Sequence, residues 1–365
     1  MIEVRGLRAR LGTFELRDVS FTVPARGYGV VIGPAGSGKT TLLETIAGIV
    51  PRLGGTVLLG DPAGAALRDV SAAPPEARGV GFVYQHAYLF PHLGVEDNIA
   101  YGAASPAAAR EAAERVGAHE LYGRGVRGLS GGERQVVAIA RAIATRPSTL
   151  LLDEPFGALD PRRRATVRRA VRTLHREWGM TTLQVTHDFA EAGLLGDVAI
   201  LLDGGRVLQA GPPERVFREP ASPYIAEFLG AENVLAGTVR RVADVAPDWL
   251  DGEPTALARG HHAIEFRSGP LAIYTVGDAT DGPAYAVIRG EEVMLSLEPH
   301  PSSARNQFSG RVVEVATLGA LTRVTLDVAG VPLVAALTTR SAQELSLVPG
   351  AHIHSSFKAM AVHLC

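Results

Sequence analysis

The run that most constrains this chain reads GPAGSGKT over residues 33–40, a glycine followed by four residues and then Gly-Lys-Thr. A short apolar run over residues 28–32 precedes it, and a helical pattern over 40–48 follows it. A strand that enters a helix through a glycine-rich loop presents backbone N–H groups to an anion. We therefore predict that this loop binds the phosphates of a nucleoside triphosphate through Gly33, Pro34, Ala35, Gly36, Ser37, Gly38, Lys39, Thr40 and Thr41.

The composition of the chain limits the number of domains that it can form and the classes of partner that it can bind. With 365 residues, 46% of them hydrophobic and 20% charged, the chain is expected to form two or three folded domains. A net charge of −2 gives no overall electrostatic case for nucleic acid as a partner. The single cysteine, Cys365, excludes a disulfide framework, and the charged N-terminus lacks the apolar core of a signal peptide. No apolar run reaches the roughly 18–20 residues that cross a bilayer, so work at a membrane requires another chain to supply the span.

Two adjacent carboxylates follow a second apolar run, residues 149–152. Asp153 fits the residue that holds Mg²⁺ beside a phosphate loop, together with the hydroxyl of Thr40. Glu154 is predicted to be the general base that polarises the attacking water. Gln85 follows another apolar run, residues 80–84, and its amide is suited either to coordinating Mg²⁺ or to orienting water; an ordinary polar loop residue is the alternative.

A second anion-binding pattern lies at residues 129–135, LSGGERQ, before the helical run 136–145. Ser130, Gly131 and Gly132 fall at the N-terminus of that helix. Because one nucleotide needs only one phosphate loop, we predict that this helix end completes a site on another copy of the chain.

Taken in order, these motifs resemble the ABC-type ATPase family, and little outside it carries both LSGGE and the following Asp-Glu pair. The resemblance implies ATP and Mg²⁺ as ligands and a homodimer that sandwiches two nucleotides. It implies that Ser130 and Gly132 contact the γ-phosphate on the opposite subunit and that Asp160 bridges the subunits. It also implies that His187 contacts the γ-phosphate and holds Glu154, and that Gln85 links the site to a membrane partner.

Two assignments in the first part of the chain have alternatives. Phe14 is the one aromatic residue near the position expected to stack on adenine. The alternative is that Phe14 is a core residue of a strand. Residues 86–128 read as a helical insertion, whose Leu89, Phe90 and Leu93 form either a groove for a partner helix or the insertion's own core.

Several other stretches have simpler readings. Residues 52–80, rich in Gly, Ala and Pro, are predicted to form a hairpin and a surface loop. The arginine-rich segment 161–178 carries an apolar stripe at Val167, Val171, Leu174 and Trp178, which favours a surface helix over a nucleic-acid arm. The hairpin 198–210 turns at a Gly-Gly pair, and we place the end of the first domain near Gly230.

From residue 231 the pattern is β-like and contains an internal repeat. The pattern N-x-[LF]-x-G-x-V opens at Asn233 and again at Asn306. Two OB-type barrels in tandem would explain it, and the scarcity of aromatic residues argues against oligonucleotide binding.

The last segment, residues 302–365, resembles the molybdate-binding Mop-type domain of molybdate/tungstate importer ATPases, on Ser303-Ala-Arg-Asn306, Gly310, 338–341 and 357–362. A tetrahedral oxyanion needs N–H and O–H donors with modest positive charge. The candidates are Ser302, Ser303, Arg305, Asn306 and Lys358. In the alternative reading, Arg305 and Lys358 are solvated and Asn306 is a turn residue; related barrels on sugar, polyamine and iron importers bind no substrate there.

The sequence thus predicts an α/β P-loop ABC ATPase domain over 1–230, with a helical subdomain at about 86–128, and tandem all-β barrels over 231–365. The expected function is ATP hydrolysis that energises a membrane importer for molybdate or tungstate. Permease subunits and a substrate-binding protein are the implied partners, at the cytoplasmic face of the cell membrane. The alternatives are an importer ATPase for sulfate, iron, a sugar or a polyamine, and a soluble ABC ATPase acting on nucleic acid.

Overall fold

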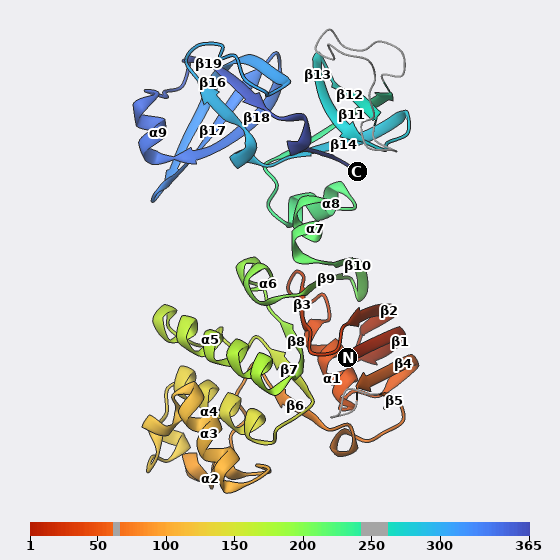
Figure 1. The fold of residues 1–365 in the computed structure, drawn as a ribbon, viewed down its shortest axis with the longest axis vertical. Coiled ribbons are helices and arrows are strands. Elements are labelled where there is room, and N and C mark those ends of the chain that lie inside the picture. The colour runs from red at the N-terminus through yellow and green to blue at the C-terminus, as the bar shows by residue number, and fades with distance from the viewer. Residues whose placement is uncertain (61–65, 242–261) are drawn as a thin grey trace. The chain divides into compact units, whose positions relative to one another are not determined.

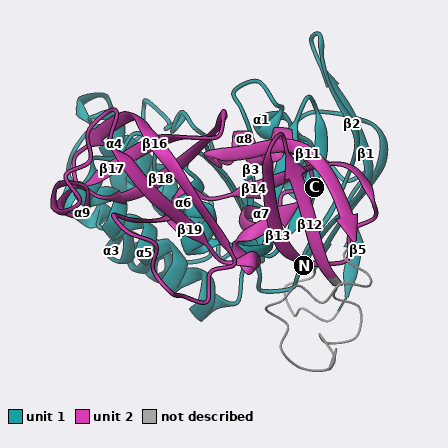
Figure 2. Cartoon of the chain, turned by 90° about the horizontal axis from the view of Figure 1, so that it is seen from above, with its two compact units in different colours: residues 1–216 teal, residues 217–365 magenta. Residues whose placement is uncertain are grey.

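The computed structural model describes residues 1–60, 66–241 and 262–365, which form two compact units, Met1–Val216 and Phe217–Cys365 (Figure 2). The segment 217–230, including α8 (Pro223–Phe228), belongs to the second unit. The division therefore lies earlier in the chain than the expected boundary near Gly230. Residues 61–65 of the predicted surface loop and residues 242–261 of the predicted β-rich part lie outside the described residues.

The first unit is built on a six-stranded sheet in the order β10-β9-β3-β8-β7-β6 (Figure 1). Strands β9, β3, β8, β7 and β6 run parallel, and β9 turns back into β10 through the predicted Gly204–Gly205 hairpin. The three central strands are buried along their whole length. Their bounds are β3 (Tyr28–Ile32), β6 (Val80–Val83), β7 (Thr149–Asp153), β8 (Thr181–Val185), β9 (Val198–Asp203) and β10 (Arg206–Gly211). Since parallel strands end at one edge, the segments that follow β3, β6, β7 and β8 meet there.

A second, antiparallel sheet covers the other side of α1 (Lys39–Ala47) in the order β2-β1-β4-β5. Its strands are β1 (Ile2–Leu11), β2 (Phe14–Val23), β4 (Arg52–Gly60) and β5 (Leu67–Asp69). Buried residues of this sheet, of α1 and of the parallel sheet form one apolar core. The core holds α1 between two sheets and so fixes the direction of its N-terminus.

The helical part of the first unit gathers α2, α3 and α4 together (Figure 1). These helices are α2 (Val95–Ala100), α3 (Pro106–Val116) and α4 (Gly131–Ala144). Because α4 packs on both α2 and α3, the helical region extends past the expected limit near residue 128. The following α5 (Pro161–Trp178) buries Val167, Val171 and Leu174, which confirms the predicted apolar stripe.

Two curled antiparallel sheets of five strands form the second unit and confirm the tandem OB-like barrels. The first has the order β13-β12-β11-β14-β20 and the second β15-β19-β16-β17-β18. The first barrel comprises β11 (Asn233–Arg241), β12 (His262–Ser268), β13 (Leu271–Gly277), β14 (Gly282–Ile288) and β20 (Val362–Leu364). The second comprises β15 (Met294–Ser296), β16 (Asn306–Leu318), β17 (Leu321–Val328), β18 (Val331–Thr338) and β19 (His352–Phe357). The short strand β20, which follows the strands of the second barrel in the chain, pairs with β14 of the first barrel. The short strand β15, which follows the strands of the first barrel, pairs with β19 of the second. The two barrels share one apolar core.

The repeated asparagines join the two barrels reciprocally. Asn306, at the start of β16, donates to the carbonyl of Tyr274 (2.9 Å) and accepts from the Tyr274 N–H (2.7 Å) in the first barrel. Asn233, at the start of β11, donates to the carbonyl of Val334 (2.9 Å) and accepts from its N–H (2.6 Å) in the second. Both asparagines are 1–2% exposed. The repeat read from the sequence is therefore a structural repeat whose first residue binds the opposite barrel.

Candidate nucleotide site

The loop between β3 and α1 requires its glycines. A Cβ on Gly33 would lie 2.0 Å from the carbonyl oxygen of Leu202, closer than any real contact. Gly36 and Gly38 have φ values of +77° and +100°, in the region that favours glycine. The tight loop therefore leads directly into the first turn of α1, where unpaired N–H groups of a helix face an anion.

Lys39 lies on this loop. Its ammonium donates to the carbonyl oxygens of Gly33 (2.9 Å) and Pro34 (2.8 Å), and the residue is 8% exposed. Burial lowers the pKa of the ammonium, while the nearby carboxylates of Glu154 and Asp153 act in the opposite direction. The loop thus holds a buried positive charge at the place where the sequence predicts phosphate.

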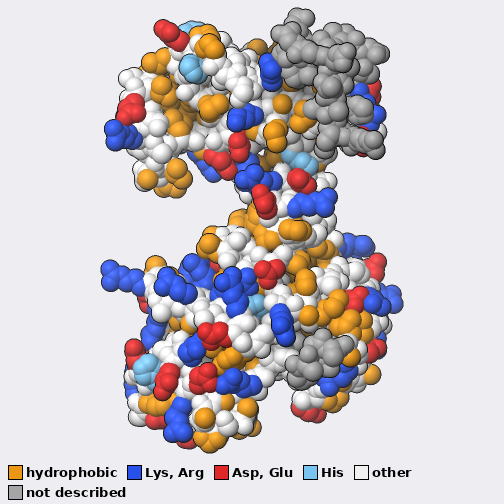
Figure 3. Space-filling view, in the orientation of Figure 1, with side chains coloured by type: hydrophobic (Ala, Val, Ile, Leu, Met, Phe, Trp, Pro, Cys, Tyr) orange, Lys and Arg blue, Asp and Glu red, His pale blue; other side chains and the backbone are white. Residues whose placement is uncertain are grey.

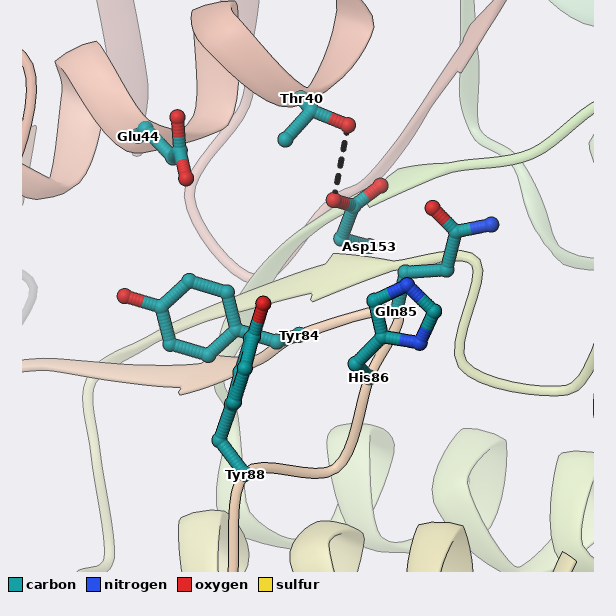
Figure 4. A pocket seen from close by; sticks show the side chains of 7 residues that line it. All are labelled: Thr40, Glu44, Tyr84, Gln85, His86, Tyr88 and Asp153. Carbon is teal, nitrogen blue, oxygen red and sulfur yellow. Dashed lines mark hydrogen bonds between the residues drawn. The ribbon is translucent and has the colours of Figure 1, made fainter. Parts of the chain in front are cut away.

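Thr40 and Asp153 meet at the edge of the parallel sheet (Figure 4). The Thr40 hydroxyl donates to one carboxylate oxygen of Asp153 at 2.8 Å. The other oxygen of Asp153, and the hydroxyl of Ser37 in the loop, are buried without a hydrogen-bond partner among the described residues. Burial raises the pKa of Asp153, and the charge of Glu154 adds to the rise. A buried carboxylate oxygen with no partner beside a threonine hydroxyl fits a Mg²⁺ site, because Mg²⁺ takes oxygen ligands and leaves water and phosphate positions.

The other two side chains predicted to be catalytic, those of Gln85 and His187, lie next to the carboxylate of Glu154. The Gln85 amide donates to its Oε2 at 3.4 Å, and Nδ1 of His187 lies 3.3 Å from the same oxygen. Glu154 itself has φ +43°, a left-handed backbone that costs free energy in a residue other than glycine. Its N–H donates to the carbonyl of Val185, the last residue of β8. The fold therefore holds one carboxylate in a strained position between an amide and an imidazole.

Two cavities flank this carboxylate and contain residues that the sequence did not single out. A cavity of about 460 Å³ is lined by Thr40, Glu44, Tyr84, Gln85, His86, Tyr88 and Asp153 (Figure 4). A second of about 270 Å³ is lined by Glu154, Phe156, Gly157, Arg164, Thr186, His187, Asp188 and Glu191. Glu44 follows Thr40 by four residues on one face of α1, a relation that belongs to no short motif. Burial raises the pKa of Glu44, and Asp153 contributes. Tyr84, His86 and Tyr88 come from the irregular segment around Gln85, where no periodicity points to the cavity.

Ser130 caps α4 and starts a capping box with Glu133. The Ser130 hydroxyl accepts from the Glu133 N–H (3.2 Å), and the Glu133 carboxylate accepts from the Ser130 N–H (2.7 Å). That N–H, with the guanidinium of Arg124, lowers the pKa of Glu133 to about 2. Gly131 and Gly132 form the first turn of α4. Among the described residues, these three positions line neither cavity beside Glu154.

The same helix is tied to the segment that carries Gln85. Gln135 donates to the carbonyl of Tyr84 at 3.1 Å, just before Gln85. Arg141 donates to the carbonyls of Ala87 and Tyr88 at 3.2 and 3.1 Å, just after it. The backbone on both sides of Gln85 is therefore hydrogen-bonded to α4.

Two further predicted residues have local roles in the fold. Asp160 is the N-cap of α5, and its carboxylate accepts from the N–H groups of Arg162 and Arg163. The latter hydrogen bond is the main cause that lowers the pKa of Asp160. The Phe14 ring lies against the phosphate loop, since a Cβ on Gly38 would fall 2.3 Å from its Cζ, and it also packs on the core. Both readings of Phe14 therefore stay open.

Leu89, Phe90 and Leu93 are half-buried. The Phe90 ring lies 4.3 Å from the ring of Tyr101 and 5.2 Å from the Arg141 guanidinium. Tyr101 is itself 58% exposed. The insertion thus presents a partly exposed aromatic surface that is held by the helix starting at Ser130.

In the second barrel, Asn306 is committed to the backbone of Tyr274 through both atoms of its amide, so its role is structural. The Ser302 hydroxyl accepts from the Ala304 N–H (3.2 Å). Ser303, Arg305 and Lys358 are exposed. Asn306 is therefore the member of the predicted oxyanion set that is least able to contact a ligand.

Comparisons with known proteins cover both units. The family model described as ABC transporter matches residues 16–157, and the model described as TOBE domain matches residues 302–364. A solved dimeric structure of an ATP-binding cassette in a post-hydrolysis state, bound to ADP and Pi, is similar with a TM-score of 0.52 and 25% identity. It covers 58% of this chain and 99% of that one.

Two curated relatives match almost end to end. The molybdate/tungstate import ATP-binding protein WtpC of Pyrococcus horikoshii is 37% identical over 374 residues, covering 100% of this chain and 99% of the relative. The sulfate/thiosulfate import ATP-binding protein CysA of Mycolicibacterium paratuberculosis is 39% identical over 367 residues, covering 95% and 96%. Within the described residues, no helix is both long and apolar enough to cross a membrane.

Proposed function

The chain belongs to the ABC transporter family, and from that premise we propose that it is the subunit whose ATP hydrolysis drives the import of a tetrahedral oxyanion. The observation that carries the hydrolytic part is the meeting of Gln85 and His187 on one oxygen of Glu154, beside the unpaired oxygen of Asp153. Of these groups, the carboxylates of Glu154 and Asp153 lie close enough to Lys39 on the loop to act on its pKa.

The residues would divide the chemistry as follows. Lys39 neutralises the β- and γ-phosphates of the substrate, and Glu154 accepts the proton of the attacking water. His187 and Gln85 keep the Glu154 carboxylate directed at that water, and His187 also contacts the γ-phosphate. Mg²⁺ bound by Thr40, Asp153 and Gln85 would neutralise charge that develops on the phosphates.

Two copies are needed for a complete site in this proposal. Ser130, Gly131 and Gly132 line neither cavity of their own chain, which supports a role at the γ-phosphate of a second copy. Asp160 would bridge the copies next to it. The hydrogen bonds from α4 to the backbone on both sides of Gln85 would couple closure of one nucleotide site to the other nucleotide site.

A dimerisation assay tests this arrangement. The variant Glu154→Gln should bind ATP and accumulate as an ATP-dependent dimer in size-exclusion chromatography. The double variant Glu154→Gln/Lys39→Ala is the control and should stay monomeric, because it cannot hold the nucleotide. A Glu154→Gln chain that binds ATP yet elutes as a monomer would contradict the shared site.

The aromatic surface around Leu89, Phe90 and Leu93 is the proposed contact with permease subunits. A substrate-binding protein would deliver the cargo to those permease subunits. This contact would place the subunit peripherally at the cytoplasmic face of the cell membrane. Support comes from the partial exposure of Tyr88 and Tyr101 next to Phe90. Cross-linking of a Leu93→Cys variant to permease in membranes tests the contact, and a cross-link-free complex with full transport activity would exclude it.

Molybdate or tungstate is the proposed cargo, with sulfate as the main rival. The two near full-length relatives are named for import of molybdate/tungstate and of sulfate/thiosulfate, and their identities of 37% and 39% do not separate the two. The cargo would also bind the barrels and hold the ATPase units apart as feedback inhibition. If saturating molybdate and tungstate leave the ATPase rate of the assembled transporter unchanged, the feedback is refuted and the ATPase assignment stands.

A further inference from the structure

One arginine of α5 differs from its neighbours on that helix in what it contacts. Figure 3 shows Lys and Arg side chains gathered on the surface of the first unit over α5, where Arg162, Arg169 and Arg176 are exposed. Arg164 is only partly exposed, and it lines the cavity of about 270 Å³ that Glu154 also lines. No sequence motif points to Arg164, and the function proposed above assigns it no role.

The guanidinium of Arg164 binds the backbone of the loop between β7 and α5. Its Nε donates to the carbonyl oxygen of Phe156 at 3.2 Å. One of its terminal nitrogens donates to the carbonyl oxygens of Gly157 at 3.4 Å and of Leu159 at 3.2 Å. Because a guanidinium presents its donors in a rigid planar fork, these three carbonyl oxygens are held in fixed positions relative to one another.

The loop that Arg164 binds begins at Glu154. It folds into two successive turns, in which the Gly157 N–H donates to the carbonyl of Glu154 and the Leu159 N–H donates to the carbonyl of Phe156, both at 3.2 Å. The Arg164 guanidinium therefore binds three residues whose backbone turns are joined directly to Glu154. A change in the direction of this loop changes the direction of the Glu154 side chain.

The backbone of Glu154 needs such support. Its φ of +43° is a strained conformation, which persists only where the surrounding structure fixes it. On the strand side, the Glu154 N–H donates to the carbonyl of Val185 at 3.0 Å. On the loop side, the side chain of Phe156 is buried and its carbonyl is bound by Arg164. Arg164 is thus part of the structure that holds the strained residue in place.

The charge of Arg164 is offset by a different carboxylate. Glu191 is 4% exposed and lines the same cavity. Burial raises the pKa of Glu191, and the charge of Arg164 acts in the opposite direction. The hydrogen bonds of the Arg164 guanidinium go to carbonyl oxygens of the loop. Arg164 therefore acts on Glu154 through the backbone.

We propose that Arg164 is a positioning residue for ATP hydrolysis, which fixes the loop 156–159 so that the Glu154 carboxylate stays directed at the attacking water. This inference rests on the proposed role of Glu154 as general base. The ammonium of Lys39 binds carbonyls of the phosphate loop and has no part in these contacts. Binding of ATP should therefore depend little on Arg164.

Steady-state ATP hydrolysis by the purified chain over a range of ATP concentrations tests the proposal. Arg164→Gln should lower kcat by roughly 10–100-fold and leave KM unchanged, because a misplacement of about 1 Å costs on the order of 10²-fold in rate. Arg164→Lys keeps the charge without the planar fork and should have an intermediate kcat. Arg169→Gln removes an exposed charge from the same helix and, as the matched control, should keep the wild-type kcat.

A double variant separates positioning of Glu154 from a general loss of stability. In the Glu154→Gln background the base is already absent, so adding Arg164→Gln should slow single-turnover ATP cleavage by less than about twofold. A further loss as large as that in the wild-type background would contradict the proposal, since Arg164 would then act independently of Glu154. Thermal unfolding shows whether each variant is folded at the assay temperature. If Arg164→Gln is unfolded, Arg164→Lys carries the test, and its kcat must fall at unchanged KM.

The outcomes distinguish this proposal from the function on which it rests. A wild-type kcat in Arg164→Gln, or a raised KM at unchanged kcat, would overturn the role of Arg164 and leave Glu154 as the base. Wild-type turnover in Glu154→Gln would overturn the role of Glu154 and, with it, the role of Arg164.

Discussion

Buried polar groups are treated in opposite ways in the two units. At the nucleotide edge of the first unit, one oxygen of Asp153 and the hydroxyl of Ser37 are buried without partners among the described residues, and Glu154 has a left-handed backbone. In the barrels, Asn233 and Asn306 are equally buried, yet each pairs with a backbone N–H and a carbonyl of the opposite barrel.

This difference in hydrogen bonding distinguishes buried polar groups that are available to a ligand from buried polar groups that stabilise the fold. An unpaired buried oxygen lowers stability until a ligand satisfies it, whereas a fully paired amide stabilises the fold and has nothing left to bind. Substitutions at the nucleotide edge should therefore lower activity and preserve or raise stability. Substitutions at the paired asparagines should lower stability and leave ATP hydrolysis nearly unchanged.

The largest effect is expected at Glu154. Glu154→Gln keeps the size of the side chain but removes the base, so hydrolysis should slow by roughly 10²–10⁴-fold while ATP still binds. Single-turnover measurements of ATP cleavage check this. Glu177→Gln, an exposed carboxylate near the end of α5, is the matched control and should hydrolyse ATP at the wild-type rate. Wild-type turnover in Glu154→Gln would remove Glu154 from its role.

The next effect concerns the paired asparagines. Asn233→Ala leaves the N–H of Val334 and two carbonyls without partners and should destabilise the second unit by about 2–3 kcal/mol, with little change in basal ATP hydrolysis. Urea denaturation measures the loss, and hydrogen exchange should accelerate at the Val334 amide. Asn306→Ala serves as the reciprocal control, with faster exchange at Tyr274 instead. Equal exchange rates at both amides in both variants would contradict the reciprocal pairing.

A gain in stability is expected at Asp153. Because burial raises its pKa in the folded state, the ionised form is disfavoured there, and the penalty is fully present above that raised value. The penalty should disappear as pH falls from the raised value through the ordinary 3.8. Asp153→Asn should therefore stabilise the ligand-free chain at pH 7 by about 1 kcal/mol and lose Mg²⁺-dependent hydrolysis.

Thermal unfolding of wild type and Asp153→Asn across pH 4–8 measures this difference. The gap between the two curves should narrow toward low pH. A variant less stable than wild type at pH 7 without ligand would show that the carboxylate serves the fold.

The smallest effect is expected from backbone strain at Glu154. Glu154→Gly relieves the φ of +43°, and the gain, partly offset by the chain entropy of glycine, should be about 0.5–1 kcal/mol in the ligand-free chain. Glu154→Ala removes the same carboxylate but keeps the strained backbone. Comparing the two variants by differential scanning calorimetry therefore isolates the contribution of backbone strain to stability. Identical midpoints for the two variants would mean that the position is not strained.

The meeting of the loop 33–40, Asp153, Glu154 and His187 was predictable because each of these motifs is contiguous and ends or follows a strand of one parallel sheet. The loop 33–40, Asp153, Glu154 and His187 follow β3, β7 and β8, so strand order alone brings them to one edge. Glu44, His86 and Glu191 were missed because helix faces and irregular loops, and no short motif, bring them to the cavities.

Sequence by itself determined the glycine-rich loop 33–40, the adjacent carboxylates Asp153 and Glu154 after one strand, the order of domains and the repeat of Asn233 and Asn306, since each is written in neighbouring residues. Tertiary structure decided what those asparagines do. They bind backbone groups 32 and 101 residues away, in the other barrel, and no local periodicity encodes that distance. It also decided that polar residues from three separate strands line one small cavity in the second barrel, because only the closed sheet brings those strands together.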